Sequence, residues 1–582
     1  MASSLKLLRP YLSERLYPII IGLISLILVD ILQVLVPRVI KRAVDDITTM
    51  DIGAGTLAYY ALIIAAIASF MAIFRLIWRN CLLGFARRVE EGLRNRFFSH
   101  IQSLPPSFFD GTNTGDLMAR GTNDINQIRM AAGMGLVAIN DTVFLGLATI
   151  GFMMFINVKL TLFVLIPMPL IVLGTKFFSS KMHKLYQDVQ AAFAYMTEVV
   201  RERFAGIRLI KAYNLQFFEA ETFRNVSREY VRENLRLVKS TGAFFPLMLF
   251  LANLSTAVVL FLGGRQAIFQ EITAGDFAAF ISYLGLLTWP MMALGWSINL
   301  MQRGKASLDR IKHILDQGQK NDQPEYPEHL PQETPELLFH DVYFSYFFNS
   351  REVLRRINLK IDPGQTVGIV GPPGSGKTTL LNLIPRLYDP TQGRILLNNI
   401  DLREFAILEL RSLITFVSQD PFLFAGTIRD NVEFVKSGVL EEELLEAAKK
   451  ADFLETIHSM PNGLDTFIGE KGITLSGGQK QRLSLTRAFL VKSRILLLDD
   501  PVSQVDTQTA ENIIGKLTEL QGEQTMIIVS HRLAPLVTAD MIVTLREGEI
   551  IEQGSHMDLV EQNGYYARSY RLQKIEQDLY DI

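Results

Sequence analysis

The sequence has little cysteine, little net charge and no targeting signal. Cys81 is the one cysteine among 582 residues, so no intrachain disulfide can form, and we interpret it as a reduced thiol in or near a membrane. The formal net charge is -2, which gives no indication of a nucleic-acid partner. The N-terminus has neither a Ser/Arg-rich transit peptide nor a small-residue cleavage site after its first apolar run. We therefore expect that run to be a retained membrane span.

Apolar sequence is in excess in the first half of the chain. The mean hydropathy of +0.21 is too high for an ordinary soluble enzyme. Several apolar segments reach about 20 residues, the length at which a helix crosses a bilayer. These segments are residues 17–37, 57–78, 133–156, 160–178, 242–263 and 277–301. One such segment alone could be a buried helix of a soluble protein, but this series predicts a six-span membrane domain.

The gaps between these segments predict the topology. The gaps after the second and fourth segments are long and rich in basic residues, such as Arg94 and Arg201. Because basic loops stay in the cytoplasm, we expect the N-terminus and everything after the sixth span to be cytoplasmic. The long gaps contain few helix breakers, so we expect the span helices to continue into them. Residues 1–16 combine apolar residues with Lys6 and Arg9, which is typical of a short interfacial helix.

Residues 371–378 read GPPGSGKT and match the phosphate-binding loop pattern G-x-x-x-x-G-K-[ST]. An apolar strand precedes them and an apolar helix follows, as the motif requires. The glycines let backbone N–H groups turn toward an anion, and the helix N-terminus adds partial positive charge. We predict that Lys377 reaches the outer phosphates and that Thr378 holds Mg²⁺. The predicted nucleotide-binding residues are Tyr346, Gly371, Pro372, Pro373, Gly374, Ser375, Gly376, Lys377, Thr378 and Thr379.

Polar residues at the ends of other predicted strands extend this site. An apolar strand ends in Asp499, which is placed to hold Mg²⁺, and Asp500, which stands where a general base would. His531 and Gln419 follow two further apolar strands, and Tyr346 could stack on a nucleotide base. Each of these residues alone is more often structural, but their order along the chain favours a site. The predicted catalytic residues are Asp500, His531 and Gln419, and the predicted metal ligands are Thr378, Gln419 and Asp499.

A second anion-binding motif follows at residues 475–479. Its sequence is LSGGQ, and it stands immediately before a helix, so its backbone N–H groups could bind a second phosphate. One γ-phosphate does not need two such sites in one chain. We therefore predict a dimer in which each motif faces the phosphate loop of the other chain. The residues assigned to this contact are Leu475, Ser476, Gly477, Gly478 and Gln479.

The composition changes after the sixth apolar segment. A polar, proline-rich stretch is typical of a linker, and alternating strands and helices of the α/β type follow it. The predicted fold is therefore a multidomain one, with an α-helical six-span transmembrane domain followed by an α/β phosphate-loop nucleotide-binding domain. The predicted parts are an interfacial helix (1–16), the transmembrane domain (17–316), a linker (317–335), the nucleotide-binding domain (336–575) and a tail (576–582).

Taken in order, these motifs resemble the ATP-binding cassette half-exporters of the type IV exporter fold, over essentially the whole chain. Turns at 469–472 (GEKG) and 503–506 (SQVD) fit the family, and residues 108–110 and 114–120 resemble its first coupling segment, which would dock near Gln419. The resemblance implies that two ATP molecules with Mg²⁺ bind between two nucleotide-binding domains. Closure of these domains would drive the spans from inward-facing to outward-facing, and hydrolysis would reset them. It also implies a location in the bacterial cytoplasmic membrane, contact with membrane lipid, and an amphiphilic, drug-like substrate.

The chain departs from the family at Asp500, where the family usually has Glu. The shorter side chain retracts the carboxylate by about 1.5 Å, and a misplacement near 1 Å can cost on the order of a hundredfold in rate. We therefore expect this chain's own loop to bind ATP and hydrolyse it poorly, although a benign replacement is the alternative. The intact 475–479 motif would serve a partner that carries the catalytic Glu. In this respect the chain resembles the half-subunits of bacterial heterodimeric multidrug exporters. Lys471 and Gln504 are also unusual for the family, but they support no conclusion.

Hints about the substrate are few. Ionisable groups inside spans are candidates for function, and aromatic residues suit a promiscuous pocket, but interhelical hydrogen bonds and core packing compete with these roles. The candidates are Asp30, Asp141, Trp289 and Trp296. The predicted function is ATP-driven export of amphiphilic compounds by a heterodimer. The alternatives are a nucleotide-gated channel or regulatory assembly, and an exporter of peptide, lipid or siderophore.

Overall fold

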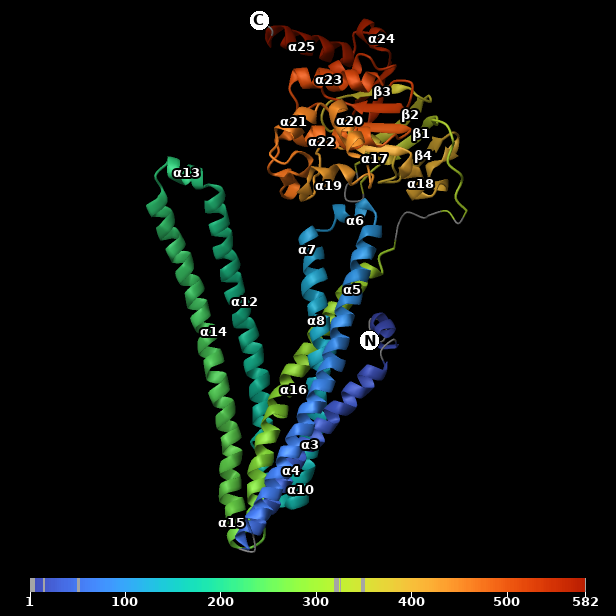
Figure 1. Ribbon diagram of the computed structural model, residues 1–582. Coiled ribbons are helices and arrows are strands. Elements are labelled where there is room, and N and C mark those ends of the chain that lie inside the picture. The colour runs from blue at the N-terminus through green and yellow to red at the C-terminus, as the bar shows by residue number, and fades with distance from the viewer. Residues whose placement is uncertain are drawn as a thin grey trace. The chain divides into compact units, whose positions relative to one another are not determined.

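The chain forms two compact units in the computed structural model (Figure 1). The first comprises Met1–Gln102 and Thr114–Gly318, and the second comprises Ser103–Asn113 and Gln319–Ile582. The structure describes residues 6–13, 16–49, 53–318, 324, 326–346 and 351–580. Parts of the predicted interfacial helix (1–5, 14 and 15), linker (319–323 and 325) and tail (581 and 582) lie outside the described residues.

The first unit is helical, and six of its described helical stretches are long and apolar enough to cross a membrane. They run over Leu16–Thr48, Ala54–Ser103, Thr114–Ile156, Val158–Ala205, Gln216–Ile268 and Ala274–Leu315. Each contains one of the predicted spans, so the six-span prediction is confirmed. The second, fourth and fifth stretches continue far beyond their apolar segments, which confirms that the long basic gaps are helical.

Most of these stretches consist of several helices. Their α-helices are α3 (Leu16–Thr48), α4 (Ala54–Trp78), α5 (Gly84–Ser103), α7 (Thr114–Ala119), α8 (Ile125–Met130), α9 (Leu136–Asn140), α10 (Gly146–Ile156), α11 (Val158–Leu165), α12 (Met168–Ala205), α14 (Gln216–Val258), α15 (Gly264–Ile268) and α16 (Ala274–Leu315). Turns of π-helix connect several of them, at Arg79–Leu83, Arg120–Asp124, Ala131–Gly135, Asp141–Leu145 and Val259–Gly263. Outside the spans lie the 3-10 turn Lys6–Leu8, α2 (Arg9–Ser13) and α13 (Ile207–Ala212), which joins α12 to α14.

Helices α3 and α16 pack closely. The buried Tyr283 hydroxyl donates a hydrogen bond to the Val34 carbonyl at 3.1 Å. At the N-terminus of α16, the Gly275 amide donates to the Asp45 carboxylate at 2.8 Å. A Cβ atom at Gly275 would lie 2.1 Å from the Lys41 carbonyl oxygen, so only glycine allows this approach. These contacts link the first and last spans of the chain.

The second unit is built on a six-stranded sheet with the order β12-β11-β3-β10-β9-β6. Its strands are β3 (Thr366–Val370), β6 (Ile414–Val417), β9 (Ile495–Asp499), β10 (Thr525–Val529), β11 (Met541–Arg546) and β12 (Glu549–Gly554). All pairings are parallel except that of β11 with β12. Every residue of β3, β9 and β10 is buried, which is typical of parallel strands covered on both faces.

Smaller sheets and helices complete the second unit. A four-stranded antiparallel sheet has the order β2-β1-β4-β5, and β7 pairs with β8. These strands are β1 (Leu337–Phe344), β2 (Leu354–Ile361), β4 (Gln392–Leu397), β5 (Ile400–Asp401), β7 (Gly426–Thr427) and β8 (Phe467–Ile468). The helices are α6 (Pro106–Asp110), α17 (Lys377–Leu383), α18 (Ile407–Ser412), α19 (Ile428–Glu433), α20 (Glu441–Lys450), α21 (Leu454–Ser459), α22 (Gly477–Leu490), α23 (Thr507–Thr518), α24 (His556–Glu561) and α25 (Tyr565–Tyr580). The α/β architecture predicted for this half is confirmed.

Candidate functional site

The predicted phosphate loop connects the buried strand β3 to helix α17. Lys377 is only 6 % exposed, and its Nζ atom donates hydrogen bonds to the carbonyls of Gly371 at 2.8 Å and Pro372 at 3.0 Å. Burial lowers the pKa of Lys377, while the nearby carboxylates of Asp499 and Asp500 oppose this shift. The lysine is therefore held inside the loop, with its ammonium group against the loop backbone.

Two glycines of the loop cannot be replaced without a clash. A Cβ atom at Gly371 would lie 2.1 Å from the Leu545 carbonyl oxygen of the neighbouring strand β11. Gly376 has φ of +102°, and a Cβ atom there would meet the Leu354 side chain at 2.7 Å. Positive φ and close backbone approach are both conditions that favour glycine. Pro372 is partly buried in this loop, whereas Pro373 and Gly374 are exposed.

Two buried polar atoms at this site have no hydrogen-bond partner among the described residues. They are the Ser375 hydroxyl oxygen and the Asp499 Oδ2 atom, and both residues are 2 % exposed. Leaving a buried polar group unpaired costs about 1–3 kcal/mol, so both atoms favour a bound ligand. Thr378 donates a hydrogen bond to Asp499, whose pKa is raised by burial. Carboxylate and hydroxyl oxygens are ligands that Mg²⁺ prefers, so the residues present fit this ion.

Parallel strand order brings the other predicted residues to the same edge of the sheet. Strands β3, β10, β9 and β6 are neighbours in this order, and the predicted site residues follow their carboxyl ends. Gln419 follows β6, and His531 follows β10. Both side chains are exposed, and the His531 carbonyl accepts a hydrogen bond from Gln573 at 2.7 Å. In open parallel sheets, ligands bind outside this edge.

Asp500 is buried and has an unusual backbone conformation, with φ of +54°. Its amide donates to the Val529 carbonyl of β10 at 2.8 Å. The Oδ1 atom of its carboxylate lies 3.4 Å from the Ser530 hydroxyl and 3.5 Å from the His531 amide. The carboxylate is therefore turned toward the end of β10, where groups of its own chain surround it.

Tyr346 belongs to an aromatic cluster beside the phosphate loop. Its hydroxyl lies 3.0 Å from the Thr379 hydroxyl, a hydrogen-bond distance. Its ring meets those of Phe344 at 4.9 Å and Tyr388 at 5.3 Å, both edge to face. The Tyr388 hydroxyl in turn donates to the two oxygens of Asp110 in α6 at 3.0 and 3.2 Å. Burial, together with the Asp110 carboxylate, raises the pKa of Tyr388.

This cluster connects the predicted coupling segment to the phosphate loop. The segment Ser103–Asn113 belongs to the second unit, and Asp110 is its contact with Tyr388. The chain of contacts continues through Tyr346 to Thr379, the residue after the loop. The family resemblance predicts that the segment docks near Gln419, and it does not mark Tyr388. No motif marks that residue, because its role depends on contacts between distant parts of the chain.

The 475–479 motif forms the N-terminus of helix α22. Ser476 caps the helix by accepting from the Gln479 amide at 3.3 Å, and the Gln479 side chain accepts from the Ser476 amide at 2.9 Å. Leu475 is buried and Gly478 is partly buried, whereas Ser476 and Gly477 are exposed. A Cβ atom would lie 2.5 Å from the Gln504 side chain if placed at Gly477, and 2.8 Å from the Gln504 carbonyl if placed at Gly478. The unusual Gln504 therefore packs directly against the motif.

Two side chains of α22 that the sequence analysis missed fix this helix in place. The buried Gln481 donates to the Asp500 carbonyl at 2.7 Å and accepts from the Gln504 amide at 3.0 Å. Arg487 donates to the Phe422 carbonyl at 2.8 Å in the loop after Gln419, and burial lowers its pKa to about 10. Helix α22 contains many other polar residues, so no sequence signal marks either contact.

The four predicted substrate residues lie in the first unit and do not form one described cluster. Asp30 is 4 % exposed and accepts a hydrogen bond from Asn140 at 3.0 Å. This contact fits the alternative to substrate binding, which was an interhelical hydrogen bond. Asp141 has a buried Oδ1 atom without a partner among the described residues. Trp289 is 59 % exposed and Trp296 is 37 % exposed.

Comparisons with known proteins agree with this architecture. Residues 19–291 match the family model described as ABC transporter transmembrane region, and residues 354–503 match the model described as ABC transporter. The probable multidrug resistance ABC transporter ATP-binding/permease protein YheI of Bacillus subtilis (strain 168) is 34 % identical over 95 % of both chains. The multidrug resistance-like ATP-binding protein MdlA of Escherichia coli (strain K12) is 33 % identical, over 96 % of this chain and 94 % of its own.

Two further relatives bear on activity and fold. An ATP-dependent lipid A-core flippase of Nitrosococcus oceani is 33 % identical over 87 % of this chain and 84 % of its own. The structure of a bacterial Atm1-family ABC exporter with ATP bound has a TM-score of 0.78 and 25 % identity, over 97 % of this chain and 98 % of that one. In this family the nucleotide-binding domain generally binds ATP with Mg²⁺. The chain therefore belongs to the ABC transporter family, as a half-exporter and multi-pass membrane protein that acts as a transport ATPase.

Proposed function

We propose that the chain exports amphiphilic, drug-like compounds across the bacterial cytoplasmic membrane as one half of a heterodimer. In this assembly its own phosphate loop holds ATP, and hydrolysis takes place mainly at the partner's loop. The observation that carries this proposal is Asp500, which replaces the usual Glu and lies 3.4 Å from Ser530 and 3.5 Å from the His531 amide. The multidrug names of the YheI and MdlA relatives support the export of drug-like compounds.

The phosphate loop and its neighbours supply the nucleotide site. The loop amides and Lys377 would bind the phosphates of ATP, and the Tyr346 ring would contact the adenine. Thr378 and Asp499 would hold Mg²⁺, which neutralises negative charge on the outer phosphates when bound. The Asp499 Oδ2 and Ser375 hydroxyl atoms, which have no partner among the described residues, support this assignment because each would gain one. Gln419 and His531 are exposed and free to face a ligand at the sheet edge.

The position of Asp500 explains the proposed asymmetry. A general base must come within hydrogen-bonding reach of the water that it activates. A Glu side chain at this position would extend about 1.5 Å beyond Asp, and a shortfall of that size costs on the order of a hundredfold in rate. The Ser530 hydroxyl and the His531 amide lie around the shorter carboxylate and leave it near the end of β10. The same chain has a complete 475–479 motif, which would serve the partner's loop.

The direction of transport follows from the family's two-state cycle. ATP stabilises the closed pair of nucleotide-binding domains, and substrate leaves in the outward-facing state that accompanies closure. Basic residues in the long helical extensions favour a cytoplasmic location for these domains. Candidate substrate contacts are Asp30, Asp141, Trp289 and Trp296. A lipid-like amphiphile is a second candidate substrate, favoured by the lipid A-core flippase relative.

ATPase measurements test the heterodimer. The chain purified alone should hydrolyse ATP at a small fraction of the rate of its complex with a half-exporter that carries Glu at the matching position. In the complex, Asp500→Glu should add a second hydrolytic site and raise single-turnover cleavage at this loop by up to about a hundredfold. Asp500→Asn is the matched control, since it keeps the length and removes the base. Robust turnover by the chain alone, or no new cleavage in Asp500→Glu, would sink the proposal.

Inverted vesicles that contain the complex separate export from a nucleotide-gated channel. Export predicts ATP-dependent accumulation of a cationic amphiphilic dye against its gradient, whereas a channel only equilibrates the dye. A fluorescent phospholipid analogue in the same vesicles tests the lipid-like alternative. Equal dye concentrations on both sides at steady state would contradict transport.

A further inference from the structure

Helix α25, at the C-terminal end of the second unit, contacts the turn that carries His531. This turn comprises residues 530–533 and follows strand β10. The partly buried Gln573 of α25 donates a hydrogen bond to the His531 carbonyl at 2.7 Å. It also accepts one from the Leu533 amide at 2.9 Å. A single side-chain amide therefore fixes two backbone groups of the turn.

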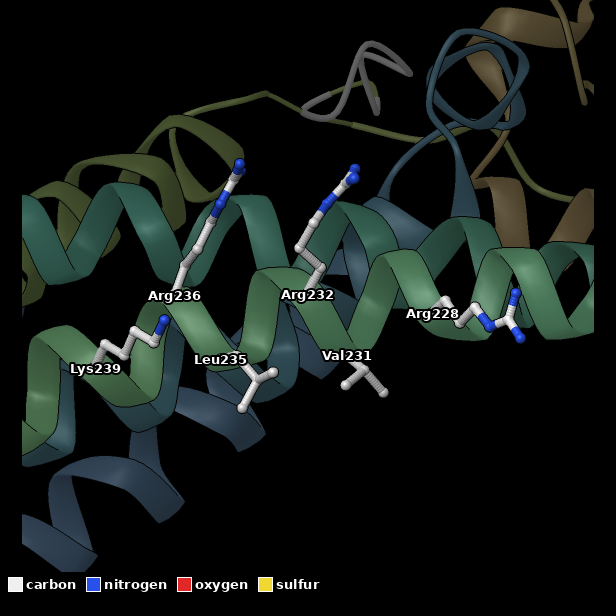
Figure 2. Close-up of a pocket in the computed structure, with 6 residues that line it drawn as sticks. All are labelled: Arg228, Val231, Arg232, Leu235, Arg236 and Lys239. Atoms are coloured by element: carbon white, nitrogen blue, oxygen red, sulfur yellow. The ribbon is translucent and has the colours of Figure 1, made fainter.

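The two hydrogen bonds of Gln573 connect distant parts of the chain, since their partners are 42 and 40 residues away. Ion pairs on helix α14 are of a different kind. Figure 2 shows Arg232 and Arg236 extending from that helix, and each pairs with a glutamate three residues before it. Pairs within one helix contribute little and position no other segment. Gln573 instead joins α25 to a turn at the edge of the sheet.

The N-terminal end of α25 is itself fixed to the sheet. The Glu552 carboxylate of β12 accepts hydrogen bonds from the amides of Tyr565 and Tyr566 at 2.5 and 3.0 Å. It also accepts one from the Thr544 hydroxyl of β11 at 3.1 Å. Tyr566 is fully buried, and Gln573 follows it by seven residues in the same helix. Because a helix is rigid over this length, the contacts of Glu552 help to determine where the Gln573 side chain lies.

A second set of contacts holds the same turn from the end of β9. The Asp500 carboxylate lies 3.4 Å from the Ser530 hydroxyl and 3.5 Å from the His531 amide. The Ser530 hydroxyl accepts from the Arg532 amide at 3.0 Å, and the Arg532 side chain donates to the Val505 carbonyl at 3.3 Å. The backbone of the turn is thus held from two directions, while the His531 side chain is exposed.

We propose that Gln573 is a positioning residue for His531, and that it holds the turn where the imidazole meets the γ-phosphate of ATP bound at residues 371–378. A hydrogen bond from the ring to a phosphate oxygen needs a separation of about 2.7–3.2 Å, so a small shift of the turn weakens it. Without the Gln573 amide, the turn keeps only its contacts toward Asp500 and Val505. This role rests on the nucleotide site proposed above, and it adds the C-terminal helix to the groups that govern ATP binding.

Competition binding to the assembled, full-length transporter tests this role. Photocrosslinking with 8-azido-ATP labels this chain's own loop, and unlabelled AMP-PNP or ADP competes for it. Gln573→Met keeps the length of the side chain and removes both hydrogen bonds. It should weaken AMP-PNP binding about three- to tenfold and change ADP binding less than twofold, because ADP has no γ-phosphate. His531→Ala should weaken AMP-PNP binding at least as much, and adding Gln573→Met to it should have no further effect.

Gln521 provides a matched control in the same unit. Its side chain donates a hydrogen bond to the Thr538 carbonyl at 3.0 Å, away from the 530–533 turn. Gln521→Met therefore removes a comparable side-chain-to-backbone hydrogen bond and should leave the binding of both nucleotides unchanged. Gln573→Glu keeps the acceptor for the Leu533 amide and loses the donor to the His531 carbonyl. It should show the same selective loss of AMP-PNP binding, to a smaller extent.

Two results would assign Gln573 a purely structural role and overturn the proposal. One is an equal loss of AMP-PNP and ADP binding in Gln573→Met, and the other is a full Gln573→Met effect in the His531→Ala background. If His531→Ala alone weakens AMP-PNP binding, only the positioning role is wrong. If neither variant changes it, the assignment of His531 to the γ-phosphate is wrong as well. Thermal unfolding and gel filtration check that each variant is folded, and Gln573→Glu decides the question if Gln573→Met is not.

Discussion

The two glycine-rich helix N-termini of the second unit look alike in sequence and differ in their surroundings. At α17, Lys377 is buried and the buried Ser375 hydroxyl has no partner among the described residues. At α22, Ser476 and Gln479 satisfy each other in a capping box, with Ser476 exposed and Gln479 partly buried. The first N-terminus therefore needs a ligand to complete its hydrogen bonds. The second N-terminus has its capping hydrogen bonds without a ligand, and its backbone at Gly477 is exposed at the surface of the chain.

Lys377→Ala should have the largest effect, and only at the first N-terminus. The substitution removes the ammonium group that the loop holds against Gly371 and Pro372. Hydrogen bonds to charged groups contribute about 1.5–3 kcal/mol each, so ATP affinity at this loop should fall about ten- to a hundredfold. Photocrosslinking of the complex with 8-azido-ATP measures this affinity, and Lys377→Arg is the control that keeps the charge. An unchanged affinity would remove the distinction between the two N-termini.

The second N-terminus should respond differently at its two glycines. Ala at Gly478 meets the Gln504 carbonyl of the backbone at 2.8 Å, whereas Ala at Gly477 meets only the flexible end of the Gln504 side chain. Gly478→Ala should therefore lower the ATPase rate of the complex about tenfold more than Gly477→Ala, since a misplacement near 1 Å has effects of this size. Adding Gln504→Ala should restore the ATPase rate of the Gly477→Ala variant, whereas the rate of the Gly478→Ala variant should stay low. Neither glycine variant should change ATP affinity at this chain's own loop, and a parallel loss of affinity would contradict the comparison.

The smallest effect is expected at Tyr388, which connects the first N-terminus to the coupling segment. Tyr388→Phe keeps the ring contact with Tyr346 and removes the hydrogen bond to Asp110. ATP affinity should stay the same, while stimulation of ATPase activity by an amphiphilic substrate should fall about two- to fivefold, because one hydrogen bond to a charged acceptor is lost. Asp110→Asn should give a similar result. A drop in ATP affinity without any change in stimulation would assign Tyr388 to nucleotide binding alone.

Patterns within one element were enough to predict the spans, the phosphate loop and the α/β half. Apolar length marked the six spans, and glycines between a strand and a helix marked the residues around Lys377. Contacts between distant segments were not predictable, because nothing near Tyr388 or Gln481 in sequence indicates Asp110 or Asp500 as partners. The direction of the Asp500 carboxylate also depends on β10, which pairs with β9 only in the folded sheet.

The candidate substrate residues are the part of the site that the sequence defines least. An acid in a span carries the same sequence signal whether it binds a substrate or another helix. The structure gives Asp30 a partner in Asn140 at 3.0 Å, and it leaves one buried oxygen of Asp141 unpaired among the described residues. The two acids are therefore distinguishable only by their neighbours, and Asp141 is the better position for mutagenesis in transport assays.

The assignment of Ser103–Asn113 to the second unit has a mechanical consequence. This short stretch stands between α5 and α7, and both of these helices lead without a break into membrane spans. The chain on each side of α6 is helical after only two or three residues, so this segment has two largely helical connections to the spans, one through α5 and one through α7.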